Sequence, residues 1–282
     1  MIAVLLALAS AVSYGSSDFV AGVMSRRVHY AWVGMVGQAG ATVLVFAALP
    51  FGGGQVSGGA LLWGGLSGLG AAAGTVTLYR GLARGQMAVA GPISGVGSAA
   101  LPVLVGLLTG ERPSLVALAG VVVALPAVWL VASGDGGPRR GGLVEGAVEG
   151  LLAGLGFGLL FVALAQAPDG SGLWPTAAGQ VTSLVAASAF VLVMARGHAV
   201  AGPLHGRTIV GVVASGALGG VATVTYLLAS RHGLLVVVGV LAALYPGMTV
   251  LLARLVLREH ASRWQLVGLA LAAIAVVAIS AG

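Results

Sequence analysis

The chain has 282 residues, of which 59% are hydrophobic and only 7% are charged, and its formal net charge is +6. A soluble domain carries roughly 25% charged residues, so this composition excludes a soluble globular protein. The basic residues are all arginines that stand singly or in pairs at the ends of apolar runs, which is typical of membrane-protein loops and not of a nucleic-acid-binding patch. The absence of cysteine excludes disulfides and thiolate metal sites.

Apolar segments follow one another along the whole chain, separated by short charged or glycine- and proline-rich interruptions. Most of the segments reach the ~20 residues that a helix needs to cross a bilayer, and no connection is long enough for a soluble domain. The sequence therefore predicts an all-α membrane protein. The ten predicted transmembrane helices cover residues 2–24, 31–50, 59–79, 86–108, 114–133, 142–166, 173–195, 207–230, 233–253 and 263–281.

The first predicted helix contains a polar stripe. Ser10, Ser13, Tyr14, Ser17 and Asp18 follow a spacing of three or four residues, which places them on one face of a helix. Polar residues inside a span face protein or a water-filled cavity, because their exposure to lipid is costly. The stripe therefore predicts the lining of a cavity, and the alternative is a surface on which a neighbouring helix packs closely.

Acidic residues inside the spans are candidates for coupling to protons or cations. Asp18 lies well inside the first segment, and Glu149 is the deeper of two glutamates near the start of the sixth. Both lie at a similar predicted depth, so we expect a carboxylate cluster of Asp18, Glu145 and Glu149 between the two halves. The alternatives are that Asp18 pairs with Arg26 at the interface and that the glutamates only balance nearby arginines.

The remaining candidate ligands lie in later spans. Gln38 and Gln180 can each bind a substrate amide or carboxylate, or merely bond to a neighbouring helix. Tyrosines are better candidates than threonines, whose hydroxyls often bond back to their own helix. Pro92, Pro102 and Pro246 are expected to kink their helices beside a site or gate. The predicted cavity-lining residues are Tyr14, Ser17, Asp18, Gln38, Tyr79, Ser94, Gln180, Tyr226 and Tyr245.

The sequence repeats itself at about half its length. With a shift of 148 residues the third to fifth segments align with the eighth to tenth without a gap, and Glu111 meets Glu259. With a shift of 142 residues Gln38 meets Gln180. Because each unit has five helices, an odd number, the second enters the membrane in the opposite sense. Such inverted repeats are typical of secondary transporters, and the alternative is a duplicated structural bundle. The two predicted repeats cover residues 1–134 and 142–282.

A common set of features occurs in the stretches "LYRGLARGQMAVAGPISGVGSAALPVLVGLLTGERPS" (78–114) and "YLLASRHGLLVVVGVLAALYPGMTVLLARLVLREHASRWQLVG" (226–268). Each has a tyrosine near a helix end, a glycine-containing loop, a helix with a central proline, and a turn ending in glutamate, Glu111 or Glu259, which we expect to be structural. These features resemble EamA-type members of the drug/metabolite transporter superfamily, over essentially the whole chain. The resemblance implies a ten-helix carrier of small organic solutes that works without ATP hydrolysis. It also implies that the first, third, fourth, sixth, eighth and ninth helices line the path.

The arginines are distributed unevenly between the two predicted sides of the membrane. Eleven lie in the connections that follow odd-numbered segments, whereas Arg112 and Arg231 lie in the others. By the positive-inside rule the arginine-rich connections are cytoplasmic, and both termini face outside. The family resemblance implies cytoplasmic termini, so the two indications disagree.

These features together predict a secondary transporter of the plasma (inner) membrane, an exporter or exchanger of small organic solutes such as amino acids, metabolites or drugs, which works by alternating access. The alternative is a flippase for lipid-linked or amphipathic cargo. An enzyme is not expected, because the spans contain no paired nucleophile and base. No cofactor, metal or nucleic acid is expected. The expected partners are the lipid bilayer, a small-molecule substrate and a second copy of the chain, the last at the apolar fifth and tenth helices if these are not simply peripheral.

Overall fold

The structure is a computed structural model that describes residues 1–83, 87–133, 143–195, 206–258, 260 and 262–282. The regular secondary structure of these residues is entirely helical. The α-helices are α1 (Ile2–Ser25), α2 (Tyr30–Gly52), α3 (Gly58–Ala83), α4 (Met87–Leu108), α5 (Leu115–Ala132), α6 (Leu143–Ala165), α7 (Trp174–Ala195), α8 (Gly206–Ser230), α9 (Leu235–Ala242), α10 (Tyr245–Val256) and α11 (Arg263–Ala281). A single 3-10 turn, η1 (Asp169–Ser171), precedes α7.

Within the described residues, ten helical segments are long and apolar enough to cross a membrane, and each corresponds to one predicted segment. The ninth, Leu235–Val256, consists of α9 and α10, which are separated by two residues. Pro246 stands in the first turn of α10, where its missing N–H has no helical acceptor to lose. The ninth segment is therefore interrupted just before Pro246, close to the predicted kink. Helix α4, in contrast, continues without interruption past Pro92 and Pro102.

The two halves pack in a mirrored way. Helices α3 and α4 of the first half lie on α6, and α8, α9 and α10 of the second half lie on α1. Glycines permit the close approach: Gly97 of α4 lies against Gly154 of α6, and Gly15 of α1 lies against the Tyr245 carbonyl of α10. This exchange of partners confirms the all-α fold of ten transmembrane helices in two inverted five-helix repeats. The predicted boundary between residues 134 and 142 lies outside the described residues.

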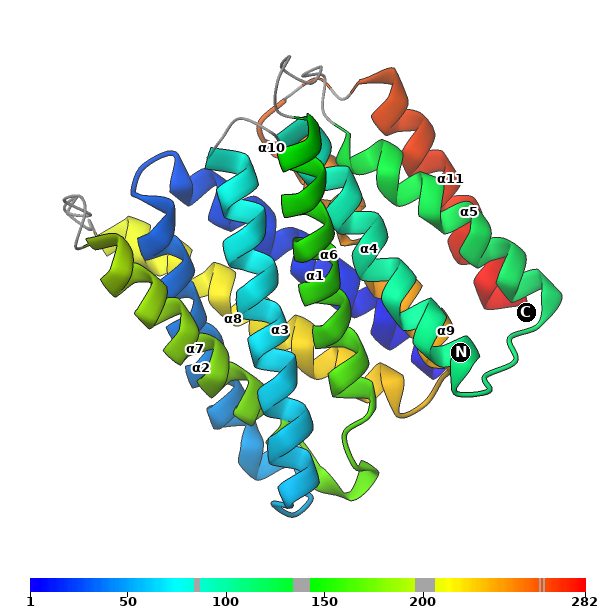
Figure 1. The fold of residues 1–282 in the computed structure, drawn as a ribbon, viewed down its shortest axis with the longest axis horizontal. Coiled ribbons are helices and arrows are strands. Elements are labelled where there is room, and N and C mark those ends of the chain that lie inside the picture. The colour runs from blue at the N-terminus through cyan, green and yellow to red at the C-terminus, as the bar shows by residue number, and fades with distance from the viewer. Residues whose placement is uncertain (84–86, 134–142, 196–205, 259, 261) are drawn as a thin grey trace.

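Helices α5 and α11 form a pair at one end of the molecule, to the right in Figure 1. Gly120 of α5 packs against Ile279, and Gly268 of α11 packs against Val131. The fifth and tenth segments are therefore peripheral, which is one of the two predicted arrangements. The two chain termini lie on the same side of the molecule, as an even number of spans requires.

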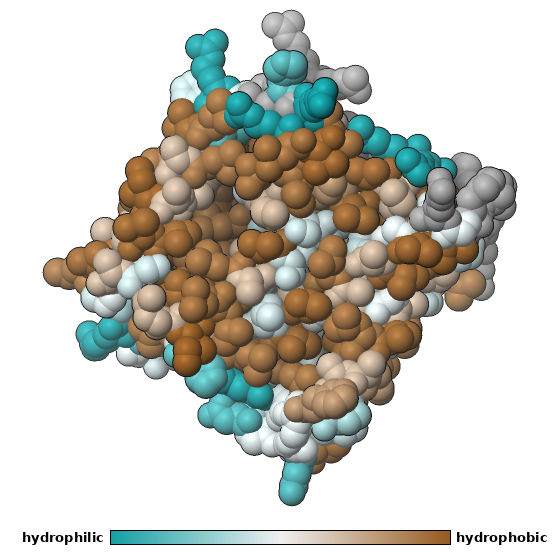
Figure 2. Space-filling model, turned by 180° about the vertical axis from the view of Figure 1, so that it is seen from behind, coloured by the Kyte–Doolittle hydropathy of each residue, from teal (hydrophilic) through white to brown (hydrophobic). Residues whose placement is uncertain are grey.

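The surface has an apolar middle and polar ends. Figure 2 shows hydrophobic side chains over the waist of the molecule, with hydrophilic ones gathered toward the top and the bottom. Large apolar side chains such as Val43, Leu192 and Val277 are mostly exposed. Such a surface is stable in hydrocarbon and not in water. The chain is therefore a multi-pass membrane protein.

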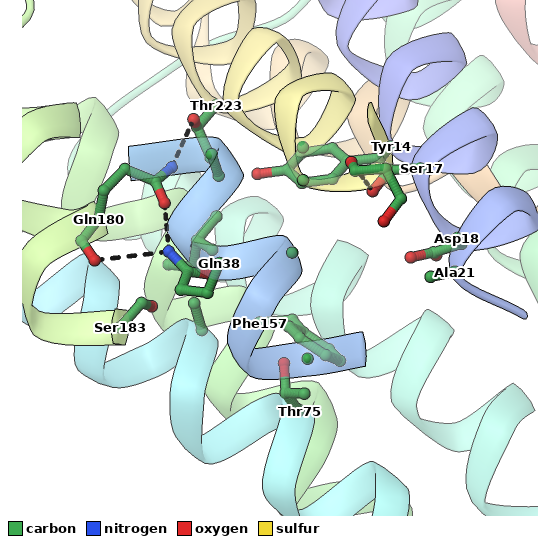
Figure 3. Close-up of a pocket in the computed structure, with 18 of the residues that line it drawn as sticks. Tyr14, Ser17, Asp18, Ala21, Gln38, Thr75, Phe157, Gln180, Ser183 and Thr223 are labelled. Atoms are coloured by element: carbon green, nitrogen blue, oxygen red, sulfur yellow. Dashed lines mark hydrogen bonds between the residues drawn. The ribbon is translucent and has the colours of Figure 1, made fainter. Parts of the chain in front are cut away.

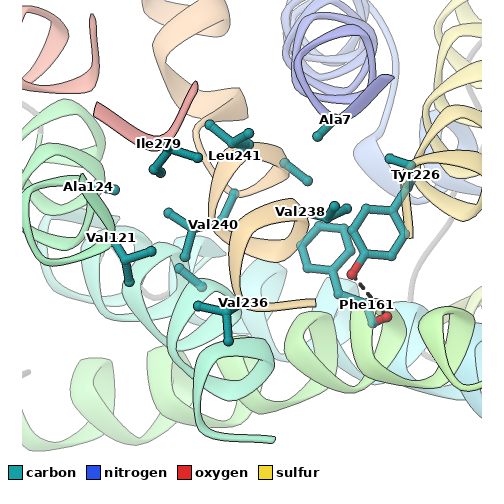
Figure 4. Packing of buried hydrophobic residues seen from close by; sticks show 14 of the residues in the cluster. Ala7, Val121, Ala124, Phe161, Tyr226, Val236, Val238, Val240, Leu241 and Ile279 are labelled. Carbon is teal, nitrogen blue, oxygen red and sulfur yellow. Dashed lines mark hydrogen bonds between the residues drawn. The ribbon is translucent and has the colours of Figure 1, made fainter. Parts of the chain in front are cut away.

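The buried core surrounds α9 (Figure 4). Val236, Val238 and Leu241 are fully buried, and they pack near the Phe161 and Tyr226 rings. These two rings lie 4.6 Å apart between centroids, and the Tyr226 hydroxyl donates a 3.1 Å hydrogen bond to the Phe161 carbonyl oxygen. A buried hydroxyl needs such a partner, so this bond fixes α8 against α6.

The amino-terminal end of α9 is capped by a carboxylate from the other half of the chain. Glu111, which follows α4, accepts hydrogen bonds from the backbone N–H groups of Leu235 (2.7 Å) and Val236 (2.9 Å). These N–H groups have no partner within their own helix, and a negative charge is favourable at a helix amino terminus. Glu111 therefore has a structural role, as predicted: its carboxylate joins the turn after α4 to the amino-terminal end of α9.

A second connection on this side fixes the end of α8. The Arg231 guanidinium donates hydrogen bonds to the Gly172 carbonyl oxygen (2.6 Å) and to the Ser171 hydroxyl (3.3 Å). Partial burial lowers the pKa of Arg231, and the nearby Asp169 carboxylate opposes this shift. The guanidinium remains a cation, because its ordinary pKa is far above neutral. The side of the molecule that carries the termini is therefore closed by specific polar contacts.

Candidate functional site

A cavity of about 680 Å³ lies between the two halves. Its exposed lining residues, Asp18, Gly22 and Ser25, are in the last two turns of α1, next to the arginine-bearing connections. On the side of the chain termini, Leu164 near the end of α6 and Thr176 near the start of α7 also line the cavity, and they are only 1% and 2% exposed. The cavity is therefore open toward the arginine-rich side and closed toward the side of the termini.

Two glutamines meet in the wall of the cavity (Figure 3). The Gln38 side-chain amide of α2 donates hydrogen bonds to the Gln180 side-chain oxygen and, at 3.4 Å, to the Gln180 backbone carbonyl of α7. The Gln180 amide in turn donates to the Thr223 hydroxyl of α8 at 3.1 Å. The two residues that the repeat alignment pairs are therefore in direct contact. Each bonds to a neighbouring helix, as one of the two predictions for them states, and each also lines the cavity.

The hydrogen bonds of Thr223 determine how both amides are oriented. Its hydroxyl donates to the Gly220 carbonyl oxygen at 2.9 Å, so it can only accept from Gln180. Gln180 must then present its nitrogen to Thr223 and its oxygen to Gln38. Gln38 uses its nitrogen for both bonds to Gln180, and its own side-chain oxygen is left as an acceptor at the cavity.

Three aromatic rings gather where α1, α6 and α10 meet. The Tyr14 ring centroid lies 6.1 Å from that of Phe161, edge to face, and 6.1 Å from that of Tyr245. All three residues line the cavity. The Tyr14 hydroxyl is buried and has no hydrogen-bond partner in the described part of the chain. This cluster therefore offers ring faces and a phenol oxygen to whatever occupies the cavity.

Asp18 lies one helical turn after Tyr14 on the same face of α1. Its side chain is exposed, and of the described residues that line the cavity it is the only one with a formal charge. No hydrogen bond or ion pair joins its carboxylate to any other described residue. The carboxylate is therefore accessible to a ligand or a proton that enters from the arginine-rich side.

The polar stripe of α1 serves both of the predicted purposes. Ser10 donates to the Ala222 carbonyl oxygen (2.9 Å) and Ser17 to that of Ser215 (2.8 Å), so both join α1 to α8. Tyr14, Ser17 and Asp18 line the cavity, and Ser10 is fully buried outside its lining. The serines therefore hold two helices together, and the larger polar side chains face the cavity.

Several predicted site residues lie elsewhere. Ser94 is buried and Tyr226 packs on Phe161, and neither lines the cavity. Glu149 is 5% exposed, lies 3.6 Å from the Arg80 guanidinium, and is also absent from the lining. Of the predicted carboxylate cluster, Asp18 lines the cavity and Glu145 and Glu149 do not, and the described residues hold no group of three acidic or histidine side chains that could bind a metal ion. The side chain of Tyr79 lies outside the described part of the chain.

The set of lining helices also differs from what the family resemblance implies. Helices α2 and α7 contribute both glutamines, whereas no described residue of α4 lines the cavity, and the ninth segment reaches it through Tyr245 of α10 and not through α9. The reason is close packing, because α4 is held against α6 at glycines and Pro102 of α4 packs on Gly239 of α9. Phe157 was missed as a lining residue. Phe157 lies in the part of the sixth helix that corresponds to the polar stripe of the first helix. The repeat alignment could therefore have predicted that it faces the cavity.

The hydrogen bonds between the glutamines lead to a first testable prediction. In a double-mutant cycle, Gln38→Ala and Gln180→Ala should couple by about 0.5–1.5 kcal/mol in unfolding free energy, because each removes the same bonds. The measurement is reversible unfolding of the purified protein in mixed micelles. Gln265, which donates to the Val131 carbonyl oxygen at the periphery, supplies the control, and Gln265→Ala should combine additively with Gln38→Ala. Additive effects for the glutamine pair itself would contradict the prediction.

Comparison with known proteins gives a family match for the first half of the chain and a fold for the whole. The model of the EamA-like transporter family matches residues 1–133. One crystal structure of a protein is similar over 98% of this chain and 95% of its own chain, with a TM-score of 0.76 and 20% sequence identity. No curated protein sequence matches the chain. At this identity the crystal structure supports the fold alone.

Proposed function

We propose that the chain, whose residues 1–133 match the EamA-like transporter family of the drug/metabolite transporter superfamily, is a secondary carrier of small organic solutes in the plasma membrane. The observation that supports the proposal best is the cavity between mirrored halves, which is open on one side and closed on the other. Inverted halves can exchange conformations, so the same structure can open toward the other side. The substrate then moves by alternating access.

The closed side has the features of a gate. Phe161, Leu164 and Thr176 are almost fully buried between the cavity and the side of the termini. Glu111 and Arg231 fix helix ends on that side by hydrogen bonds that domain motion can break and remake. The arginine bias supports a cytoplasmic location for the open side, against the cytoplasmic termini that the family resemblance implies, and on the arginine bias we infer a cytoplasm-open state. Asp18, at the open end, is the stronger candidate for proton or cation coupling, because Glu149 is paired with the half-exposed Arg80 guanidinium and lies outside the cavity lining.

Alternating access predicts that both ends of the cavity become accessible to water in turn. The chain has no cysteine, so single cysteines can be introduced into the natural sequence. In sealed vesicles of known orientation, we expect a charged thiol reagent to modify Ser25→Cys from the arginine-rich side. We expect it to modify Thr176→Cys from the opposite side, because opening of that side exposes a residue that is now 2% exposed.

The control position is Val128 of α5, which is 1% exposed and outside the cavity, and Val128→Cys should stay unmodified from both sides. If Thr176→Cys also stays unmodified from the side of the termini while the protein is folded, the carrier proposal is wrong, and the molecule is a rigid scaffold with a one-sided cavity.

A further inference from the structure

The serine and threonine hydroxyl groups of the cavity are almost all committed as donors. Seven of the eight serine and threonine residues in its described lining donate their hydrogen to a backbone carbonyl, and only Thr75 lacks such a bond. A hydroxyl whose hydrogen is used can offer a ligand only its lone pairs. The seven residues are Ser17, Ser25, Ser67, Thr176, Ser183, Ser215 and Thr223.

The other polar groups of the lining add further acceptors. Gln38 has its side-chain oxygen left over, because its nitrogen donates twice to Gln180. The Asp18 carboxylate is an acceptor with no described partner. No arginine, lysine or histidine is among the described lining residues, so nothing described there balances this charge. A ligand that brings N–H donors and a positive charge is therefore complementary to these groups. The unpartnered Tyr14 hydroxyl can also donate, but an anion there would meet the unbalanced Asp18 carboxylate one helical turn away.

The aromatic rings favour the same ligand. Tyr14 and Asp18 are one helical turn apart on α1, so a cation at the carboxylate lies within reach of the Tyr14 ring face. Tyr245 and Phe161 extend this surface, each with its ring centroid 6.1 Å from that of Tyr14. Phe157 lines the cavity on another side (Figure 3). The site therefore combines a carboxylate with ring faces, which together bind organic ammonium groups.

We propose that the cavity selects small organic cations that carry N–H donors, with the Asp18 carboxylate as the counter-ion, the Tyr14 and Tyr245 rings beside the charge, and the hydroxyl and amide oxygens of the wall as hydrogen-bond acceptors. This inference names the substrate class of the carrier and in that respect rests on the proposed function. Binding itself does not require transport, so the two are tested separately.

The test uses four compounds that share an aromatic ring and differ in the polar group: phenethylamine, its N,N,N-trimethyl derivative, phenethyl alcohol and hydrocinnamate. Each is added at millimolar concentration and neutral pH to the purified full chain, and the thermal unfolding midpoint is followed, because a ligand of the native state raises it. We expect phenethylamine to raise the midpoint in a concentration-dependent way. The trimethyl derivative, which keeps the charge and lacks N–H donors, should bind more weakly, and the alcohol and the anion should leave the midpoint unchanged.

The variants identify the counter-ion. Asp18→Asn should weaken phenethylamine binding at least about tenfold, since the cation loses its paired charge. Glu145→Gln removes an exposed carboxylate near the same side but outside the cavity, and should leave binding unchanged. If Asp18→Asn does not fold, the comparison of the four compounds on the unaltered chain still decides the substrate class.

Stabilisation by hydrocinnamate equal to that by phenethylamine would overturn the proposal, as would full phenethylamine affinity in folded Asp18→Asn, or the absence of any shift with all four compounds. If one of these occurs while Thr176→Cys is still modified from the side of the termini, the carrier survives and only the cation class is lost. If the cations bind and Thr176→Cys stays unmodified, the protein binds cations without carrying them.

Discussion

We expect Gly216→Ala to lower the unfolding free energy by about 1–3 kcal/mol, a large effect for one methyl group. Gly216 of α8 lies so close to α2 that a Cβ atom there would overlap the Gly37 carbonyl oxygen, which belongs to the backbone and cannot rotate away. The two helices would have to separate at the point where both line the cavity. The measurement is the thermal or denaturant unfolding midpoint of the purified variant.

The reciprocal residue supplies the matched control. A Cβ atom at Gly37 would meet nothing nearer than 3.6 Å, which is ordinary contact. Gly37→Ala should therefore be neutral or slightly stabilising, because alanine is favoured over glycine in a helix by about 1 kcal/mol. Equal losses at the two positions would mean that the interface tolerates no side chain at all. No loss at Gly216 would mean that α2 and α8 are not in close contact.

The second large effect is expected at Glu111. Glu111→Ala removes both hydrogen bonds from the α9 N–H groups and leaves these groups without an acceptor in a buried position. Hydrogen bonds to a charged group contribute about 1.5–3 kcal/mol, so we expect a loss of at least that size. Glu111→Gln should lose less, because its amide oxygen can still accept from one of the N–H groups. The measurement is the unfolding free energy of the three proteins.

An exposed glutamate in the first turn of another helix separates the cap from a general charge effect. Glu145 stands in the first turn of α6 and is exposed. Glu145→Ala removes the same charge from a helix amino terminus and should cost less than about 1 kcal/mol. If the two alanine variants lose equally little, the contacts from Glu111 to Leu235 and Val236 do not stabilise the fold.

Much of the fold follows from the sequence by length and periodicity alone. A helix must be about 20 residues long to cross the bilayer, so ten apolar segments of that length determine ten spans, and the structure has them. The repeat alignment then pairs Gln38 with Gln180, and mirrored packing brings the two together. Placing Asp18 on one face with Tyr14 needed only the helical spacing.

Which polar residues reach the cavity could not be predicted in the same way. Ser94 and Tyr226 are as polar as the lining residues, yet one is enclosed between packed helices and the other bonds to the Phe161 carbonyl oxygen. A polar residue in a span must face something other than lipid, and sequence cannot tell a cavity from a neighbouring helix, because both satisfy this requirement.

The sequence by itself therefore determined a membrane protein of ten helices in two inverted halves, because hydrophobic length, repeat period and an odd number of spans per repeat leave no other arrangement of its segments. Only the tertiary structure decided which of its carboxylates is available. Glu149 is held by Arg80 between packed helices, whereas Asp18 faces the open cavity. The difference depends on which side chains from distant segments meet each carboxylate, and such contacts are made by packing between helices and not by the order of residues along any one of them.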